Sequence, residues 1–149
     1  MRFVIDRATV RDAEEVGYLF DLDRQFYRQP SDRVAASAFL RDRLERAESV
    51  VFVARNDAGR IIAFAQLYPL FCSVALKRQW LLYDLYVLPE ARRAGVARAL
   101  LERCRELGIL TGSHALFLET AHTNTAAQRL YETMGWQREG QFVKYNLWL

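Results

Sequence analysis

Cysteine and histidine are scarce in this chain, which has two of each among 149 residues. Cys72 and Cys104 stand far apart and form no C-x-x-C pair, so the sequence supports neither a disulfide framework nor a zinc site. We therefore expect no metal. Cys104 has a structural explanation, because it falls in an apolar stripe at helical spacing. The stripe consists of Val96, Leu100, Cys104 and Leu107.

Long apolar runs are also lacking. None approaches the roughly 20 residues that a membrane-spanning helix requires, and residues 1–6 have no apolar core of a signal peptide. These absences predict a cytoplasmic protein without membrane contact. Glycine (seven) and proline (three) are few as well, which argues against a disordered or fibrous chain. The length suits one domain, residues 1–149, with a single core.

Charge of one sign is not in large excess, because 21 Lys and Arg residues face 18 Asp and Glu residues, a net charge of +3. The basic residues are spread along the chain without a dense run, which argues against nucleic acid as a partner. A small anionic ligand would account for the excess equally well.

The first third of the chain predicts one strand and two helices. A strand is expected over residues 2–8, and a helix capped by Thr9 over residues 10–27. After a break that contains proline, a second helix begins at Ser31 or Asp32. Its core-facing residues are expected to be Val34, Ala38, Leu40 and Leu44.

The middle of the chain predicts a hairpin and a further strand. Residues 49–55 and 60–68 are largely apolar, and the turn residues 56–59 join them. Residues 69–78 have no clear period and are expected to form a loop. Residues 80–88 then form the next strand.

The last third continues with helices and strands in alternation. A helix over residues 96–107 is expected to end at Gly108, followed by a strand over residues 115–120. Strand, helix and strand in this order imply a parallel pair. A helix over residues 124–134 follows, and alternation within residues 136–149 suits a closing antiparallel strand. The whole predicts a mixed α/β sheet.

A basic turn joins the strand 80–88 to the helix that follows it. The first turn of a helix leaves backbone N–H groups without intrahelical partners and suits a phosphate. Arg92 and Arg93 add mobile positive charge, while Ala94, Gly95 and Ala97 let an anion approach the backbone. The turn lacks the P-loop and G-x-G-x-x-G patterns. The helix start, the two arginines and the small residues together predict a pyrophosphate site. The alternative is an ordinary helix start with two solvated arginines.

Two sequence motifs follow one another in this chain. The turn fits the pattern Q/R-x-x-G-x-G/A at Arg92, Gly95 and Ala97, and residues 124–136 fit N-x-x-A-x-x-L-Y-x-x-x-G-F/W. The second set of matches is Asn124, Ala127, Leu130, Tyr131, Gly135 and Trp136. With this separation the two motifs resemble the GNAT superfamily of N-acetyltransferases. Arg93 and Ala97 stand where many members have glycine, which leaves less room for phosphates.

The resemblance implies an α/β (α+β) fold, the GNAT fold, with a mixed, mostly antiparallel sheet, one parallel splayed strand pair and about four flanking helices. It also implies acetyl-CoA as the cofactor. The pyrophosphate would lie on the N–H groups of residues 93–98, and the pantetheine arm on the backbone of residues 85–87. Asn124 would contact the arm, although capping its helix would alone explain it. The implied coenzyme residues are Leu85, Tyr86, Val87, Arg92, Arg93, Ala94, Gly95, Val96, Ala97, Arg98 and Asn124.

Acetyl transfer from a thioester needs a neutral amine and a proton for the leaving thiolate. Tyr131 occupies the position of the family's general acid, and it also suits a core aromatic of an amphipathic helix. Asp84 is the first choice of base, because an acid in an apolar strand needs a partner such as an amine. A neighbouring arginine would serve equally as that partner. Glu119 and His122, near the strand ends, are the alternative bases.

The expected substrate is a primary amine of a small molecule that attacks the thioester directly in a ternary complex. Tyr27 and Tyr68 would bind it by cation–π contact or serve only in packing, and Glu119 is the third substrate-binding candidate. The alternatives are acetylation of a protein lysine or N-terminus, and a noncatalytic acyl-CoA-binding module.

Two further expectations come from the resemblance. Tyr68-Pro69, residues 84–87 and Thr120-Ala121 look closest to the branch with histone-, polyamine- and D-amino-acid-acetylating enzymes. A homodimer is suggested, formed through the C-terminal strands around residues 142–148, where exposed edges need cover.

Overall fold

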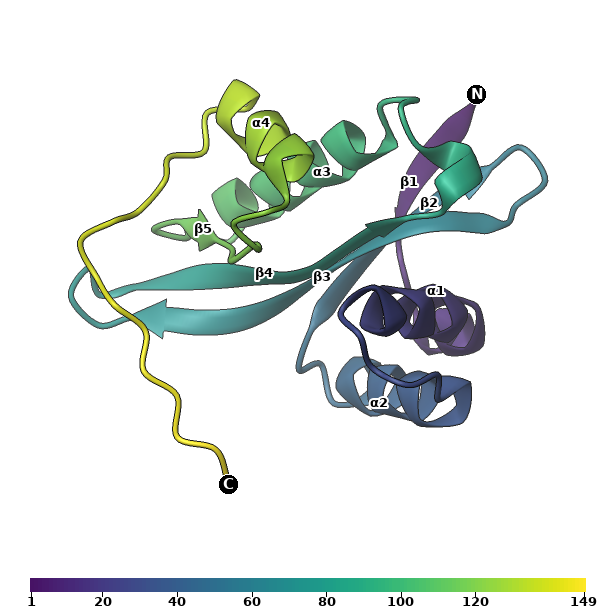
Figure 1. Ribbon diagram of the computed structural model, residues 1–149, viewed down its shortest axis with the longest axis horizontal. Coiled ribbons are helices and arrows are strands. Elements are labelled where there is room, and N and C mark those ends of the chain that lie inside the picture. The colour runs from purple at the N-terminus through teal and green to yellow at the C-terminus, as the bar shows by residue number, and fades with distance from the viewer. The chain divides into compact units, whose positions relative to one another are not determined.

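Five strands form one sheet in the order β1-β2-β3-β4-β5 in the computed structural model, which describes residues 1–149 (Figure 1). The chain divides into two compact units, Met1–Leu118 and Glu119–Leu149. The strands are β1 Phe3–Arg7, β2 Val50–Asn56, β3 Ile61–Cys72, β4 Lys77–Val87 and β5 Leu116–Phe117. The helices are α1 Ala13–Phe26, α2 Arg33–Glu45, α3 Val96–Leu110 and α4 Thr125–Thr133, with short 3-10 turns at Val10–Asp12 and Pro89–Ala91.

The pairing of the strands confirms the expected mixed sheet. Strands β1 to β4 are antiparallel neighbours, and β5 is parallel to β4. The parallel pair is short, because only Trp80 opposite Leu116 and Leu81 opposite Phe117 are in register. Beyond this contact, from residue 82 to residue 87, the β4 edge that faces away from β3 has no strand beside it.

A bulge interrupts β4 where it passes β3. Gln66 lies opposite Asp84, and Leu67 lies opposite Leu82, so Tyr83 is an extra residue in β4. A bulge changes which face of the sheet the following side chains occupy. This one places the Asp84 side chain beside that of Gln66.

The helices of the first unit cover both faces of the sheet, with α3 on one face and α1 and α2 on the other (Figure 1). The predicted α3 stripe, which includes Cys104, is buried as expected. On the opposite face the Phe20 ring of α1 packs edge-on against the Phe64 ring of β3, 6.2 Å between centroids. This second face carries the polar cluster described below.

The loop expected over residues 69–78 is largely wrong. Strand β3 continues to Cys72 and β4 begins at Lys77, so only residues 73–76 form a turn. The Arg78 guanidinium lies over the Phe71 ring, 5.2 Å from its centroid. The side chains of this hairpin alternate only weakly between apolar and polar, so the sequence shows no clear strand period. The backbone pairing of the two strands determines its structure instead.

Three other expectations are corrected. Leu40 is buried as expected, but Val34 is 83% exposed and Ala38 is exposed, because Ala36 and Ser37 complete the narrow face of α2 that packs on α1. Helix α3 continues past Gly108 to Leu110. A Cβ atom at Gly108 would meet the Leu116 side chain, so this glycine provides space for β5 instead of a cap.

The predicted strands at the end of the chain are also shorter or absent. Strand β5 has two residues of the six expected over residues 115–120. Residues 137–149 of the second unit have no regular secondary structure. A strand requires a hydrogen-bonded neighbour, which alternation in the sequence cannot supply.

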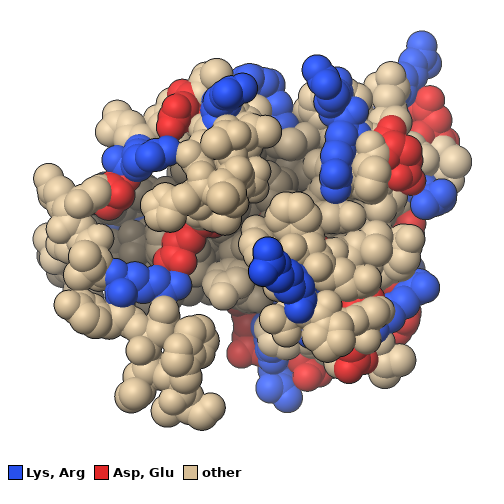
Figure 2. Space-filling view, in the orientation of Figure 1, with Lys and Arg blue, Asp and Glu red and all other residues tan.

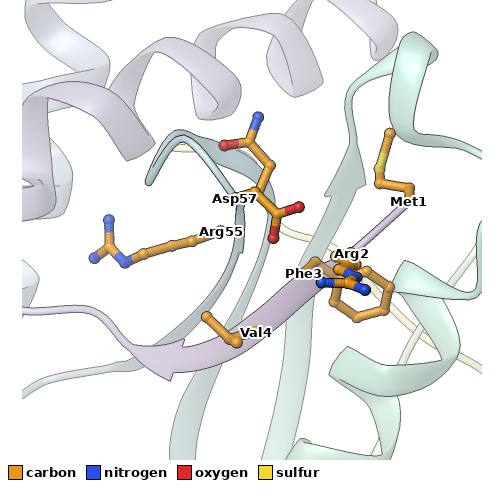
Figure 3. Close-up of a pocket in the computed structure, with 7 residues that line it drawn as sticks. Met1, Arg2, Phe3, Val4, Arg55 and Asp57 are labelled. Atoms are coloured by element: carbon orange, nitrogen blue, oxygen red, sulfur yellow. The ribbon is translucent and has the colours of Figure 1, made fainter.

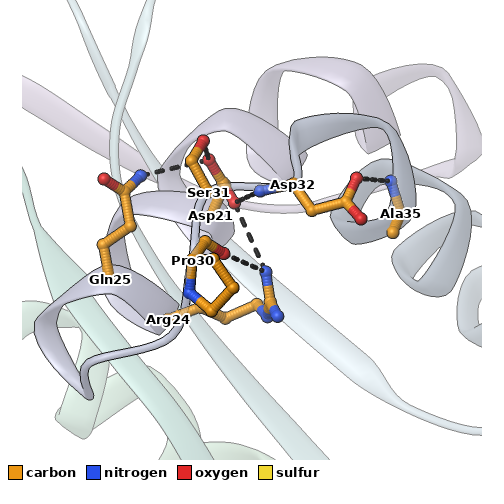
Figure 4. A network of polar contacts seen from close by, with 7 residues as sticks. All are labelled: Asp21, Arg24, Gln25, Pro30, Ser31, Asp32 and Ala35. Carbon is orange, nitrogen blue, oxygen red and sulfur yellow. Dashed lines mark hydrogen bonds and ion pairs between the residues drawn. The ribbon is translucent and has the colours of Figure 1, made fainter.

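A polar network closes the connection between α1 and α2 (Figure 4). The Asp21 carboxylate accepts hydrogen bonds from the Ser31 hydroxyl (2.7 Å), the Asp32 backbone N–H (2.7 Å), Gln25 (3.1 Å) and Arg24 (3.4 Å). Asp32 in turn caps α2 as expected, because its carboxylate accepts from the Ala35 N–H at 3.0 Å. The network fixes the loop that follows Tyr27.

Helix α1 approaches α2 closely at Gly17. A Cβ atom there would lie 2.8 Å from the Ser37 Cα atom, so backbone would have to move. We expect Gly17→Ala to lower the free energy of unfolding by about 1–3 kcal/mol in denaturant titrations. Gly140→Ala, where no atom lies within 4 Å of the new Cβ, is the matched control. Equal stability of the two variants would contradict this packing.

Candidate active site

The basic turn after β4 has an open, left-handed backbone. Gly95 has φ 81° and is followed directly by α3, and no atom lies within 4 Å of a Cβ atom built on it. No side chain caps the helix, and its first intrahelical bond runs from the Ala99 N–H to the Gly95 carbonyl at 3.0 Å. The N–H groups of Val96 and Ala97 precede this bond and have no carbonyl partner within the helix. This geometry can hold an anion.

The two arginines of the turn differ in the contacts of their side chains. The Arg92 Nε atom donates to the Val87 carbonyl at 2.9 Å, and its guanidinium lies over the Tyr86 ring, 5.6 Å from the centroid. Arg92 is therefore held against the end of β4, and the expectation that it supplies mobile charge is wrong. Arg93, with φ 63°, is exposed. Arg98 lies in the first turn of α3.

The open edge of β4 presents backbone groups from alternate residues. The Leu88 N–H donates to the Ile62 carbonyl of the β3 side at 2.9 Å. Backbone groups alternate between the two edges of a strand, so those of Leu85 and Val87 point away from β3 and those of Tyr86 point toward it. The Arg92 side chain already donates to the Val87 carbonyl. The N–H groups of Leu85 and Val87 and the carbonyl of Leu85 therefore remain available to a ligand.

Asp84 is buried on the α1 face of the sheet, with 8% of its surface exposed. Its Oδ2 atom accepts a hydrogen bond from Gln66 Nε2 at 2.9 Å, and Gln66 Oε1 accepts from the Ser49 hydroxyl at 2.9 Å. No arginine or lysine pairs with it, so the alternative of a structural ion pair is wrong. Burial raises the pKa of Asp84 to about 6, against the opposing effect of the Gln66 hydrogen bond.

A second buried carboxylate, Asp23 of α1, lies near the first and was missed by the sequence analysis. It is 5% exposed, and no hydrogen bond or ion pair reaches its carboxylate. Burial, and then the charge of Asp84, raises the pKa of Asp23 to about 7. The signal was present in the sequence, because Asp23 follows Val16 and Leu19 on the buried stripe of α1.

Tyr27 lies near both carboxylates, and Tyr68 lies near Asp84. The Tyr68 and Tyr83 rings are in contact, 5.5 Å between centroids. Burial, and then the charge of Asp84, raises the pKa of Tyr68, and burial followed by the charges of Asp23 and Asp84 raises that of Tyr27. The structure therefore brings the candidates Tyr27, Tyr68 and Asp84 into one cluster, with neutral phenols beside two carboxylates.

The second unit holds the remaining candidates. Asn124 precedes α4, but its side chain makes no capping bond, and its Nδ2 atom donates to the Thr120 hydroxyl at 3.3 Å. The expected cap is therefore wrong. Tyr131 is half-buried in α4, its ring centroid 5.9 Å from that of Trp136. The exposed Glu119 pairs with Lys144 at 2.7 Å, and His122 is exposed.

The other surfaces of the protein present fewer groups that could bind or activate a ligand. An open depression of about 510 Å³ is lined by Met1–Val4 and Arg55–Asp57 (Figure 3). Arg55 is already paired with Asp6 and Asp12. Basic and acidic side chains are interspersed over the face shown in Figure 2. No group of His, Cys, Asp or Glu side chains is arranged to hold a metal ion, and no helix combines the length and apolarity needed to span a membrane.

Comparison with known proteins agrees with this arrangement. Residues 15–136 match the family model described as the acetyltransferase (GNAT) family. An uncharacterized N-acetyltransferase, YhfO of Bacillus subtilis (strain 168), is 43% identical over 143 residues, 96% of this chain and 95% of that protein. A probable acetyltransferase of Haemophilus influenzae is 33% identical over 103 residues, 69% of this chain and 70% of that protein.

A solved structure is similar over the whole chain. The crystal structure of a probable acetyltransferase superposes with a TM-score of 0.91 at 37% identity, covering 100% of this chain and 98% of that one. These relatives give no support to the narrower branch suggested by Tyr68-Pro69 and residues 84–87. The matched motifs, the splayed β4–β5 pair and the similarity over nearly the full length show that this chain belongs to the acetyltransferase (GNAT) family of N-acetyltransferases.

Proposed function

We propose that residues 1–149 act as one acetyl-CoA-dependent N-acetyltransferase domain that transfers the acetyl group to a primary amine of a small molecule. The reaction proceeds by direct attack within a ternary complex. The observation that carries this proposal is Asp84, a buried carboxylate without a cationic partner, on the strand whose far end leads into the anion-binding turn. An ammonium substrate would supply the missing partner.

The turn and the open strand edge support acetyl-CoA as the cofactor. Gly95 leaves open space at the start of α3, where the N–H groups of Val96 and Ala97 would bind the pyrophosphate. The backbone of Leu85 and the Val87 N–H would hold the pantetheine arm along the edge of β4. Bound acetyl-CoA supplies an activated acetyl thioester next to the acceptor amine.

Two side chains would carry out the proton transfers. Asp84, ionised above pH 6, accepts a proton from the acceptor ammonium, directly or through water. The neutral nitrogen then forms the new bond to the acetyl carbon while the carbon–sulfur bond breaks, and the nitrogen releases its second proton to water, which leaves a neutral amide. Tyr131 would donate its phenolic proton to the departing thiolate, a role that rests on its place in the second motif.

Location and assembly are part of the proposal. Two free cysteines and a mixed surface charge are consistent with the cytoplasm. Exposed apolar side chains in the C-terminal segment would be covered in a homodimer. They are Phe142, Val143, Tyr145, Leu147 and Trp148.

The direct test is acetyl-CoA-dependent thiol release by the purified protein with polyamines, amino acids, aminoglycosides and lysine peptides, against a control without amine. Release with a small amine supports the proposal, whereas release only with peptides favours a protein acceptor. Coenzyme binding without release for any amine would indicate the noncatalytic module.

We expect Tyr131→Phe to lower kcat by about 10–1,000-fold, with the KM for acetyl-CoA changed less than about threefold. The phenyl ring keeps the packing against Trp136 and lacks the phenolic hydroxyl that would donate the proton. Tyr145→Phe, at an exposed tyrosine of the same unit, is the matched control. Full activity of Tyr131→Phe would remove this residue from the mechanism.

A further inference from the structure

Two buried carboxylates of the first unit lack a cation. Asp23 of α1 and Asp84 of β4 are each more than nine-tenths buried, and no ion pair reaches either. Nearby arginines are engaged elsewhere, because Arg24 binds Asp21 at 3.4 Å and Arg43 binds Glu48 at 3.2 Å. A buried carboxylate that is neither paired nor fully hydrogen-bonded is costly to the fold.

Asp21, two residues earlier on the same helix, shows how this fold satisfies a structural carboxylate. It is also buried, and it accepts four hydrogen bonds, two of which come from Ser31 and Asp32 in the α1–α2 connection (Figure 4). Asp23 accepts none. A residue kept for folding would resemble Asp21, so Asp23 is better explained by a ligand that is absent from the free protein.

The surroundings of Asp23 suit a cation. The Tyr27 phenol stays neutral near both carboxylates, and the Tyr68 phenol stays neutral near Asp84. Aromatic faces attract ammonium groups, and neutral phenols can accept hydrogen bonds from them. The cluster thus offers two negative groups and two nearby phenols, with Asp84 already assigned to the reacting nitrogen in the proposed function.

We propose that Asp23 is a specificity-determining residue that binds a second cationic group of the acceptor, so that the preferred substrate carries two amines. One ammonium is held by Asp23, while the other loses its proton to Asp84 and is acetylated. This inference rests on the proposed function for the identity of the reacting amine. It assigns the acceptor to the class of short dicationic amines.

Stability separates a ligand-binding carboxylate from a structural one. Asp23→Asn removes an uncompensated buried charge, so we expect its Tm to rise above that of the wild type at pH 8. The folded-state pKa near 7 exceeds the unfolded value of 3.8, so the folded protein binds more protons between these values and loses stability as pH rises through them. The stabilisation should therefore be larger at pH 8 than at pH 5. A lower Tm for Asp23→Asn at both pH values would indicate a structural role.

The binding test uses unbranched diamines of two to five carbons and the matching monoamines, added to the full-length protein with coenzyme A at pH 8. We expect the wild type to bind the best diamine at least about tenfold more tightly than its monoamine, by calorimetric titration. Asp23→Asn should lose this preference and keep coenzyme A affinity. Glu14→Gln, which removes an exposed carboxylate of α1 paired with Arg41, is the control with the same change of charge and should retain it.

Turnover separates the two proposals. Transfer to monoamines and diamines with equal kcat/KM, unaffected by Asp23→Asn, overturns the inference and leaves the acetyltransferase function intact. Diamine binding that depends on Asp23 without any acetyl transfer supports Asp23 as the residue that binds the second ammonium and refutes the proposed reaction. Absence of a diamine preference in the wild type overturns the inference whether or not transfer occurs.

Discussion

Replacement of Asp84 by Asn is expected to lower kcat for amine acetylation by about 10²–10⁴-fold, the usual contribution of a general base. Asparagine keeps the size of the side chain and can still accept a hydrogen bond from Gln66, so the loss concerns proton transfer. Coenzyme A affinity, measured by calorimetric titration, should change less than about threefold. Asp57→Asn, on the exposed turn after β2, is the control.

The pH profile provides a second readout of the same variant. Burial raises the pKa of Asp84 to about 6 and that of Asp23 to about 7. Ionised carboxylates are required for the proposed reaction, so wild-type kcat/KM should rise between pH 5 and pH 8. Residual activity of Asp84→Asn should lack the step near pH 6. An unchanged profile and rate in this variant would assign the base to another residue.

The second large effect is expected at the turn where the pyrophosphate is proposed to bind. Gly95→Glu places a carboxylate in the open space before α3 and imposes φ 81° on a residue with a side chain. Lost hydrogen bonds to charged phosphate are worth about 1.5–3 kcal/mol each, so we expect the Kd for coenzyme A to rise by at least about 100-fold. Calorimetric titration measures it directly.

Gly59→Glu controls for backbone strain. Gly59 has φ 79°, and no atom lies within 4 Å of its Cβ position, but it belongs to the β2–β3 turn. Both variants should lose similar stability in thermal melts, and only Gly95→Glu should lose coenzyme affinity. Equal coenzyme affinity in the two variants would place the pyrophosphate elsewhere.

Local sequence signals predicted the open turn before α3 well and the surrounding packing poorly. The start of α3 is determined by residues that are adjacent in the sequence, because Gly95 and the small side chains around it lie within one turn of the helix start. The buried face of α2 depends on α1, so periodicity alone misassigned Val34. Gly108 looked like a helix end, but contact with Leu116 explains it. The same local rules missed the long β3–β4 hairpin.

The sequence by itself determined the order of elements, the family motifs and the candidate Asp84, because these depend on short spacings and residue types. Only the tertiary structure decided that Asp84 has no arginine partner and that Asp23 lies near it. These two residues are far apart in the chain, and they meet because α1 packs on β4 and the bulge at Tyr83 places Asp84 on that face. Burial and mutual charge, which set their pKa values, arise only from that packing.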